Sequence, residues 1–277
     1  MVQDIYPKEL HNEYVNKTVS KESVIFAFRE DTVLCSNNDK SRFPLHENLE
    51  SSNCECIYLF EIDGIDYFLA KDENIKVTPE YDYSHINVFR SKMLPQHLAF
   101  AGLTAYHLYK WYRDNKFCGR CGNVLERDTK ERALVCKKCG NCIYPKISPV
   151  VIVGVVNRNH LLMTKYANRE YAKYALIAGF IEIGENAEGA VRREVMEEVG
   201  IKIKNITYYK SQPWGLSDSL LFGYFAELDG EQDLHIEEDE LSEAVWIERE
   251  SITTEADNFS LTNEMICKFK NQMKKIS

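Results

Sequence analysis

The chain has 277 residues, of which 44% are hydrophobic and 28% are charged, and its formal net charge is -9. This length suffices for two domains with a small module between them, and the composition is that of a soluble globular protein. No apolar run approaches the roughly 20 residues that a membrane helix needs, and the first residues lack a signal peptide. We therefore expect a cytoplasmic protein without a membrane partner. The acidic balance also disfavours a generic nucleic-acid binder, which is basic overall.

The first part of the chain, residues 1–115, is predicted to be a β-rich domain that ends in a helix. Asp63-Gly64 is a good hairpin turn of the primed type and is flanked by two strand candidates. Pro95 to about Arg113 is predicted to be a helix, because its apolar residues repeat at intervals of three and four. Cys54-Glu55-Cys56 places two thiols on one side of a strand, and we interpret them as ordinary thiols. This part of the chain shows no catalytic constellation.

Two C-x-x-C turns follow, and they predict a zinc ribbon over residues 116–143. Cys118 and Cys121 form the first turn, and Cys136 and Cys139 form the second. Four thiolates provide the tetrahedral ligand set of a closed structural Zn²⁺ site, which leaves no open position for catalysis. In a chain without a secretion signal this spacing favours metal over disulfides. The ribbon also carries basic residues that could contact phosphates, although such residues more often form only a solvated face.

From residue 144 to residue 277, strands and helices alternate. We expect a buried strand over 149–156 and a helix from about Asn186 to Val199. A final helix is expected after Ser260, which is a plausible N-cap. The remaining strand candidates are 161–163, 201–209, 220–225 and 244–247. Between the second and third of these, we expect a strand end that breaks into a loop at Pro213. The predicted fold class is therefore α+β, with a β-rich N-terminal domain, a zinc ribbon and a C-terminal domain in which helices and a mixed sheet form an α/β/α sandwich.

The predicted helix over 186–199 carries an unusual acidic face. Glu194, Glu197 and Glu198 are neighbours on a helix surface, where like charges destabilise a helix in isolation. A hard divalent cation would offset this repulsion, because Mg²⁺ prefers carboxylate oxygens. The alternative is a solvated acidic face. The glycines that bracket the helix and its apolar stripe favour a packed helix that presents its acids at a fixed place.

The stretch from Gly179 to Ile201 resembles a complete Nudix box. Its fixed positions are Gly179, Glu185, Arg193-Glu194-Val195, Glu197-Glu198 and Gly200-Ile201. A zinc ribbon before the box and Ser211-Gln212-Pro213-Trp214 after it are similar to the NADH pyrophosphatase family of Nudix hydrolases. The resemblance covers roughly residues 118–277. This chain departs from the family at Gly215-Leu216-Ser217, where the family typically has Pro-Phe-Pro.

The resemblance implies a set of site residues and a cofactor. Mg²⁺ or Mn²⁺ ligands would be Glu194, Glu198 and Glu240, with Glu197 also at the metal site. Arg193 belongs with this catalytic set as the residue that holds the loop through box carboxylates, with Glu185 as its expected partner. The implied substrate-binding residues are Glu131, Tyr144, Ala178, Phe180, Gln212, Pro213, Trp214, Gly215, Leu216, Ser217, Asp218, Ser219 and Thr262.

The resemblance further implies hydrolysis of the pyrophosphate of NADH or NAD⁺ to nicotinamide mononucleotide and AMP. The same chemistry on an NAD-capped RNA would be decapping. Phe180 and Tyr144 resemble the aromatic residues that stack on the base, with the tyrosine supplied by the partner subunit of a homodimer. A carboxylate near the metal-bound water would act as base, and Glu197 and Glu240 both remain candidates. The alternatives are a Nudix hydrolase of ADP-ribose or dinucleoside polyphosphates, and a non-catalytic nucleotide-sensing or nucleic-acid-binding protein.

Overall fold

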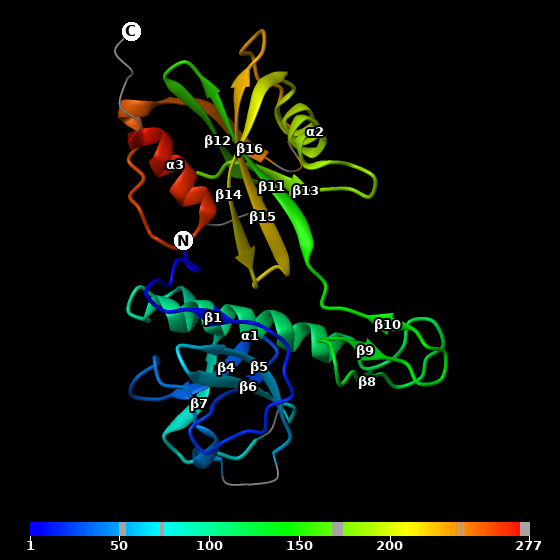
Figure 1. The fold of residues 1–277 in the computed structure, drawn as a ribbon. Coiled ribbons are helices and arrows are strands. Elements are labelled where there is room, and N and C mark those ends of the chain that lie inside the picture. The colour runs from blue at the N-terminus through cyan, green and yellow to red at the C-terminus, as the bar shows by residue number, and fades with distance from the viewer. Residues whose placement is uncertain (50–53, 73–74, 168–173, 238, 240, 272–277) are drawn as a thin grey trace. The chain divides into compact units, whose positions relative to one another are not determined.

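The structure is a computed structural model, and it describes residues 1–277 except 50–53, 73–74, 168–173, 238, 240 and 272–277 (Figure 1). Contacts divide the chain into two compact units. The N-terminal unit comprises Val2–Lys146 and Gly215–Asp218, and the C-terminal unit comprises Met1, Ile147–Trp214 and Ser219–Ser277. The ribbon thus groups with the N-terminal part, and the expected domain boundaries after residues 115 and 143 stay predictions.

Ahead of helix α1 (Gln96–Asp114), the described residues of the N-terminal unit form two small sheets, as expected for a β-rich domain. One sheet has the strand order β1-β5-β6-β2 and the other β3-β4-β7. Strands β5 and β6 meet at Asp63-Gly64, where both residues have positive φ, so the predicted primed hairpin turn is confirmed. The strands are β1 (Leu10–His11), β2 (Val24–Phe26), β3 (Phe28–Arg29), β4 (Thr32–Ser36), β5 (Cys56–Ile62), β6 (Ile65–Ala70) and β7 (Tyr81–His85), and the short 3-10 helices are η1 (His46–Asn48) and η2 (Ile86–Arg90).

Helix α1 (Gln96–Asp114) closes the first part of this unit. Pro95 is the N-cap of α1, so the helix begins one residue later than predicted. Gly102 allows the helix to approach the ring of Phe89, because a Cβ at this position would lie 2.0 Å from that ring. The ribbon follows as a sheet in the order β10-β9-β8, built from β8 (Glu126–Arg127), β9 (Leu134–Val135) and β10 (Cys142–Ile143).

The C-terminal unit is built on one mixed sheet with the strand order β14-β15-β11-β12-β16, and β13 also pairs with β11. Strands β11 and β15 run parallel, and the other neighbours run antiparallel. The elements are β11 (Ser148–Asn157), β12 (His160–Tyr166), β13 (Ile177–Phe180), α2 (Ala187–Val199), β14 (Ile203–Trp214), β15 (Ser219–Leu228), β16 (Leu241–Glu248), η3 (Arg249–Ser251) and α3 (Leu261–Asn271). The predicted mixed sheet is confirmed.

A helix covers each face of this sheet (Figure 1). Successive strand residues point to opposite faces, so Val151 and Val153 of β11 pack with α2, whereas Ile152 packs with α3. The α2 side of this core includes Val191 and Val195, which are fully buried. The three layers confirm the predicted α/β/α sandwich. Among the described residues, none of the helices combines the length and hydropathy that crossing a bilayer requires.

Strand β14 corrects one expectation, because it does not end before Pro213. It continues to Trp214, with Pro213 opposite Leu220 of β15. Proline lacks the N–H that an interior strand needs, but β14 is the outermost strand of the sheet, where this loss is tolerated. Residues 211–214 therefore lie on a strand and not in a loop.

Candidate functional site

Both ends of helix α2 are capped, and the C-cap, Gly200, is one of the glycines expected to bracket the helix. The Asn186 side chain accepts a hydrogen bond from the backbone N–H of Gly189 at 2.7 Å, which caps the first turn. Gly200 ends the helix in the left-handed conformation, with φ of 72°, and its N–H bonds to the carbonyl of Met196. With both ends fixed and one stripe buried in the core, the helix holds its acidic side chains in a defined position.

The three glutamates of α2 differ in exposure. Glu194 is 9% exposed and Glu198 is 2% exposed, and they stand one helical turn apart. Glu197 lies toward solvent, with a side chain that is 58% exposed. Two neighbouring carboxylates that are this deeply buried carry a high electrostatic cost unless cations or hydrogen bonds compensate them.

Arg193 supplies part of that compensation. Its guanidinium donates to both carboxylate oxygens of Glu185, at 3.0 and 2.8 Å, so the expected pairing with Glu185 is confirmed. It also donates to Glu194 at 2.7 Å and Glu197 at 2.9 Å. A further bond, to the carbonyl of Phe180 at 2.9 Å, ties the helix to the end of β13. Arg193 therefore fixes the loop between β13 and α2 against the acidic face.

The backbone of β13 leaves room for one of these acids. A Cβ atom at Gly179 would lie 1.9 Å from Cδ of Glu194 and 2.1 Å from both of its carboxylate oxygens. Any side chain at Gly179 would displace that carboxylate. The opening glycine of the box is therefore a steric requirement of the Glu194 position, which the sequence pattern alone did not reveal.

The donor chemistry of this face fits Mg²⁺ or Mn²⁺, because both ions take carboxylate oxygens. Glu240, the predicted ligand beyond the helix, lies outside the described residues. Three residues earlier, Glu237 donates its backbone N–H to the carbonyl of Glu198 at 3.0 Å. The backbone N–H of Leu241 donates to the carbonyl of Glu237. The acidic segment is thereby attached to the C-terminal end of α2. Among the described residues, only the four cysteines bring three or more metal-ligand atoms together.

The expected substrate residues of the C-terminal unit lie on four elements. Ala178 and Phe180 are on β13, and Phe180 is 54% exposed, as a stacking platform requires. Pro213 is exposed near the end of β14, and Thr262 is in the first turn of α3. Trp214 makes an edge-to-face contact with Phe259. Ser219, at the start of β15, is buried.

Gln212 has a different environment from the other expected substrate residues. It is fully buried, and its side-chain amide donates to the carbonyl of Phe259 at 2.8 Å. Its amide oxygen accepts the backbone N–H of Leu261, the first residue of α3, at 2.7 Å. Both ends of the amide hold the start of α3 against β14. We therefore expect Gln212 to shape the pocket by positioning α3.

Four other expected substrate residues, 215–218, belong to the N-terminal unit, where they contact α1. Lys110 pairs with Asp218 at 2.6 Å and donates to the carbonyl of Leu216 at 2.9 Å. Position 215 must be glycine for this packing, because a Cβ there would lie 2.1 Å from the carbonyl oxygen of Leu103. Ser217 is exposed. Sequence reasoning missed Lys110, because no motif marks a helix residue that contacts a loop more than a hundred positions away.

Two further expected substrate residues are bonded to each other at the end of the ribbon. The Tyr144 hydroxyl donates to a carboxylate oxygen of Glu131 at 2.7 Å. This bond to Glu131 raises the pKa of Tyr144 to about 12, so the phenol stays protonated at neutral pH. Tyr144 is 60% exposed, which leaves it available for stacking.

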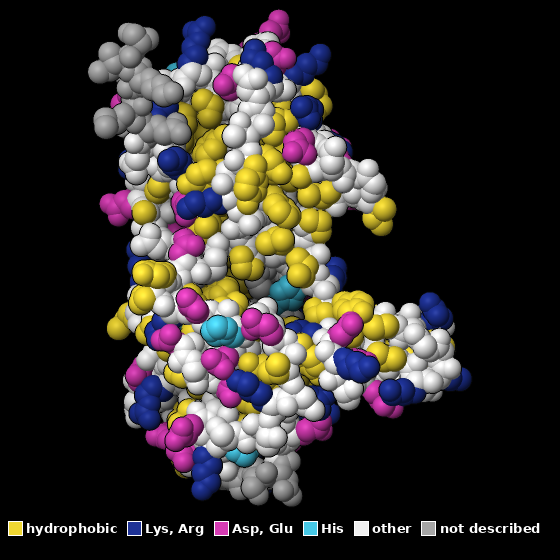
Figure 2. Space-filling model, viewed as in Figure 1, with side chains coloured by type: hydrophobic (Ala, Val, Ile, Leu, Met, Phe, Trp, Pro, Cys, Tyr) yellow, Lys and Arg dark blue, Asp and Glu magenta, His cyan; other side chains and the backbone are white. Residues whose placement is uncertain are grey.

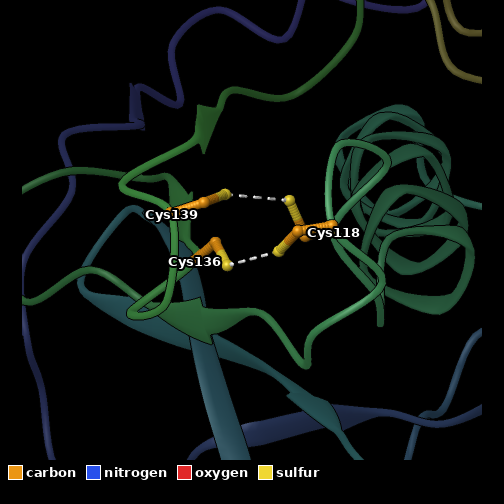
Figure 3. A group of neighbouring side chains, drawn as sticks. Cys118, Cys136 and Cys139 are labelled. Carbon is orange, nitrogen blue, oxygen red and sulfur yellow. Dashed lines mark hydrogen bonds between the residues drawn. The ribbon is translucent and has the colours of Figure 1, made fainter.

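The four predicted zinc ligands converge in the ribbon. Cys118, Cys136 and Cys139 are labelled in Figure 3. All four Sγ atoms lie within 4.8 Å of one another, with Cys118 3.6 Å from Cys139 and Cys121 3.5 Å from Cys136. The backbone N–H of Arg120 lowers the pKa of the Cys118 thiol to about 6, which favours the thiolate that Zn²⁺ binds. Cys142 is exposed and outside this cluster. Four thiols from two tight turns fit one tetrahedral Zn²⁺.

The basic residues of the ribbon divide into two groups. Arg132 is held by the carbonyl of Leu59 at 2.6 Å, and Arg127 pairs with Glu55 at 3.0 Å, so both serve the packing of the N-terminal unit. The others are exposed, and Lys and Arg side chains stand out on the ribbon in Figure 2. These exposed residues are Lys116, Arg120, Lys130, Lys137 and Lys138.

Comparisons with known proteins find family models that match the ribbon and the C-terminal part of the chain. Residues 146–268 match the NUDIX domain model, and residues 113–144 match the NADH pyrophosphatase zinc ribbon domain. The NAD-capped RNA hydrolase NudC of Salmonella schwarzengrund (strain CVM19633) is 41% identical over 139 residues, which are 50% of this chain and 54% of that protein. The protein of the same name from Salmonella typhi is 40% identical over the same shares. The chain thus spans about half the length of these relatives.

Among solved structures, a NUDIX hydrolase from Nitrosomonas europaea is similar to this chain. It has 22% sequence identity and a TM-score of 0.48, and the match covers 56% of this chain and 90% of that one.

Proposed function

We propose that this chain, which belongs to the NADH pyrophosphatase family of Nudix hydrolases, hydrolyses the pyrophosphate bond of NADH and NAD⁺. The products would be nicotinamide mononucleotide, reduced when NADH is the substrate, and AMP. The observation that carries the proposal is the pair of buried carboxylates, Glu194 and Glu198, on one face of α2 beside the side-chain-free Gly179. A structural helix has no need of two buried acids one turn apart, whereas a divalent-metal hydrolase does.

Each residue of the site then has a stated role. Mg²⁺ or Mn²⁺ held by Glu194 and Glu198 would neutralise the pyrophosphate and lower the pKa of a bound water. Arg193 holds the box loop and fixes Glu194 against β13. Glu197 and Glu240 remain the two candidates for the base that takes the proton of the attacking water. Phe180 would stack on the base of the dinucleotide, and Tyr144 of a second copy would complete that stack in a homodimer.

A second candidate activity is removal of NAD caps from RNA 5′ ends. The names of the relatives from Salmonella favour it, and so do the exposed Lys and Arg side chains of the ribbon, which would meet the phosphates of an RNA body. Such contacts make binding weaken as salt rises, whereas hydrolysis of a free dinucleotide would not depend on them.

One experiment tests both candidates and their competitors. The full chain is incubated with Mg²⁺ and, separately, NADH, NAD⁺, ADP-ribose, a dinucleoside polyphosphate and NAD-capped RNA, and kcat/KM is compared. The proposal expects the highest value on NADH, NAD⁺ or NAD-capped RNA. A higher value on ADP-ribose or the dinucleoside polyphosphate would move the assignment to the alternative Nudix hydrolases. Turnover of none of the five would leave the nucleotide-sensing alternative.

A further inference from the structure

We propose that Cys54 and Cys56 form a dithiol that a peroxide oxidises to an intramolecular disulfide. The two cysteines lie in the N-terminal unit at the start of β5, outside the zinc cluster. Their sulfur atoms are 4.0 Å apart, and the Cys56 thiol donates toward the sulfur of Cys54. Both residues are partly exposed, so a small oxidant can reach them. The sequence interpretation of two ordinary thiols did not anticipate this contact.

The geometry allows the bond but makes it easy to reduce. A disulfide needs its sulfurs about 2 Å apart, so the two must approach by roughly another 2 Å. Cysteines separated by one residue close a small ring, and strained or exposed disulfides are the labile, regulatory ones. The remaining cysteines outside the zinc cluster differ, because Cys35 and Cys267 are buried and the exposed Cys142 contacts the side chain of Tyr144.

The hydrogen bond between the thiols also assigns their order of reaction. The Cys56 S–H lowers the pKa of Cys54, whereas contact with Cys54 and burial raise the pKa of Cys56. Cys54 is therefore the thiolate that attacks, because the thiolate and not the thiol is the nucleophile. Cys56 keeps its proton until the second step.

The reaction balances in two steps with one peroxide. The Cys54 thiolate attacks a peroxide oxygen, the O–O bond breaks, and hydroxide leaves as the sulfenic acid forms. Cys56 then loses its proton and its sulfur attacks the Cys54 sulfur. The S–S bond forms as the S–O bond breaks, and a second hydroxide leaves. The two hydroxides end as water, and the two thiols have given two electrons to hydrogen peroxide.

Glu55 transmits this change to its neighbours. It lies between the two cysteines, and its carboxylate binds Lys71 at 2.8 Å and Arg127 of β8 at 3.0 Å. Drawing the flanking sulfurs together reorients residue 55, so we expect oxidation to weaken the bond between Glu55 and Arg127. The dithiol thus lies next to the contact between Glu55, the residue before β5, and Arg127 of the ribbon.

Peptide mapping of the zinc-loaded full chain tests the proposal directly. Trypsin releases residues 43–71 as one peptide that contains Cys54 and Cys56 and no other cysteine. After graded hydrogen peroxide and then iodoacetamide, we expect this peptide to be lighter than the reduced, unalkylated peptide by two hydrogen atoms. Dithiothreitol should restore two alkylation sites, and zinc should stay near one per chain throughout.

Two variants, each with one cysteine replaced by serine, complete the test. Cys54→Ser should abolish the peptide-internal disulfide and leave Cys56 to be alkylated, and Cys142→Ser should react as the wild type does. The proposal is overturned if residues 43–71 keep two alkylated cysteines until the ribbon has released its zinc. It is also overturned if Cys54 joins a cysteine other than Cys56. Neither result depends on the hydrolase assignment, because the readout is the mass of a peptide.

Discussion

Gly179 lacks a side chain at the place where the carboxylate of Glu194 lies. An added Cβ would meet Cδ of Glu194 at 1.9 Å, a distance that atoms do not tolerate. The pairing joins the end of β13 to the middle of α2, so strand and helix can pack closely only if one partner is glycine. The position of the acid is thus set by the absence of a group on the strand.

This relationship predicts the effect of Gly179→Ala. The new methyl group must displace Glu194, and a misplacement of about 1 Å at a catalytic group can cost about 100-fold in rate. We expect kcat/KM on the preferred dinucleotide to fall by about that factor while the circular dichroism spectrum is kept. Gly64→Ala is the matched control, because its positive φ of 80° costs stability in the N-terminal unit without touching the site. Equal activity of the two variants would contradict the prediction.

Glu198→Gln should lower turnover strongly and preserve the fold. The amide has nearly the same shape but lacks the charge that holds a divalent cation, so we expect kcat to fall by about 100-fold to 1,000-fold. Glu188→Gln is the control, because it removes a charge from the exposed first turn of the same helix. Steady-state kinetics at saturating Mg²⁺ would measure both. A near-native rate for Glu198→Gln would make the metal assignment wrong.

Arg193→Gln should destabilise the chain in a pH-dependent way. Hydrogen bonds from Arg193 hold the pKa of Glu185 below its ordinary value of 4.5. A carboxyl whose pKa is lower in the folded chain stabilises the fold above its unfolded pKa, and this contribution disappears as pH falls through the lowered value. We expect the variant to melt about 2–4 °C below the wild type at pH 7. The gap should narrow below about pH 4.5. A gap that widens in acid would refute the assigned role.

Gln212→Ala should act on stability more than on substrate binding. It leaves the carbonyl of Phe259 and the N–H of Leu261 without their buried partner, which costs about 3 kcal/mol of unfolding free energy. Gln232→Ala, at an exposed amide, should change that free energy by less than about 0.5 kcal/mol. Urea denaturation measures both variants. A large rise in KM without a loss of stability would return Gln212 to the set of direct substrate contacts.

Zinc analysis should find about one Zn²⁺ per chain, and Cys118→Ser should reduce this to near zero. The ion contributes folding free energy, so the variant and the chelator-treated wild type should both lose the ordered ribbon. Cys142→Ser should keep its zinc, because Cys142 is outside the cluster. Nine reactive thiols in a folded, metal-free protein would contradict the zinc site.

Much of this molecule could be predicted from local sequence signals. Helix α2 ends at Gly200, one of the glycines expected to bracket it, and the hairpin turns at Asp63-Gly64, because caps and turns depend on residues close together in the chain. The C-x-x-C pairs predicted the four-cysteine cluster for the same reason. Pairing of Arg193 with Glu185 followed from the box pattern.

The positions that the sequence did not predict depend on contacts between distant residues. Gln212 looked like a substrate contact because of its motif, but its amide is bonded to residues 47 and 49 positions away. Pro213 suggested the end of a strand, and only the outer position of β14 in the sheet allows it to continue. Cys54 and Cys56 gave no signal beyond their spacing, because the distance between two sulfur atoms depends on side-chain rotation.

The four residues Gly215–Asp218 group with the N-terminal unit although they lie deep in the second half of the chain. No single cut can therefore separate the two units into independent fragments. A fragment that starts at residue 147 carries Asp218 away from Lys110, and it removes the packing of Gly215 against Leu103. In a chimera that joins the first half of a relative to the second half of this chain, residues 103–110 and 215–218 should come from the same protein.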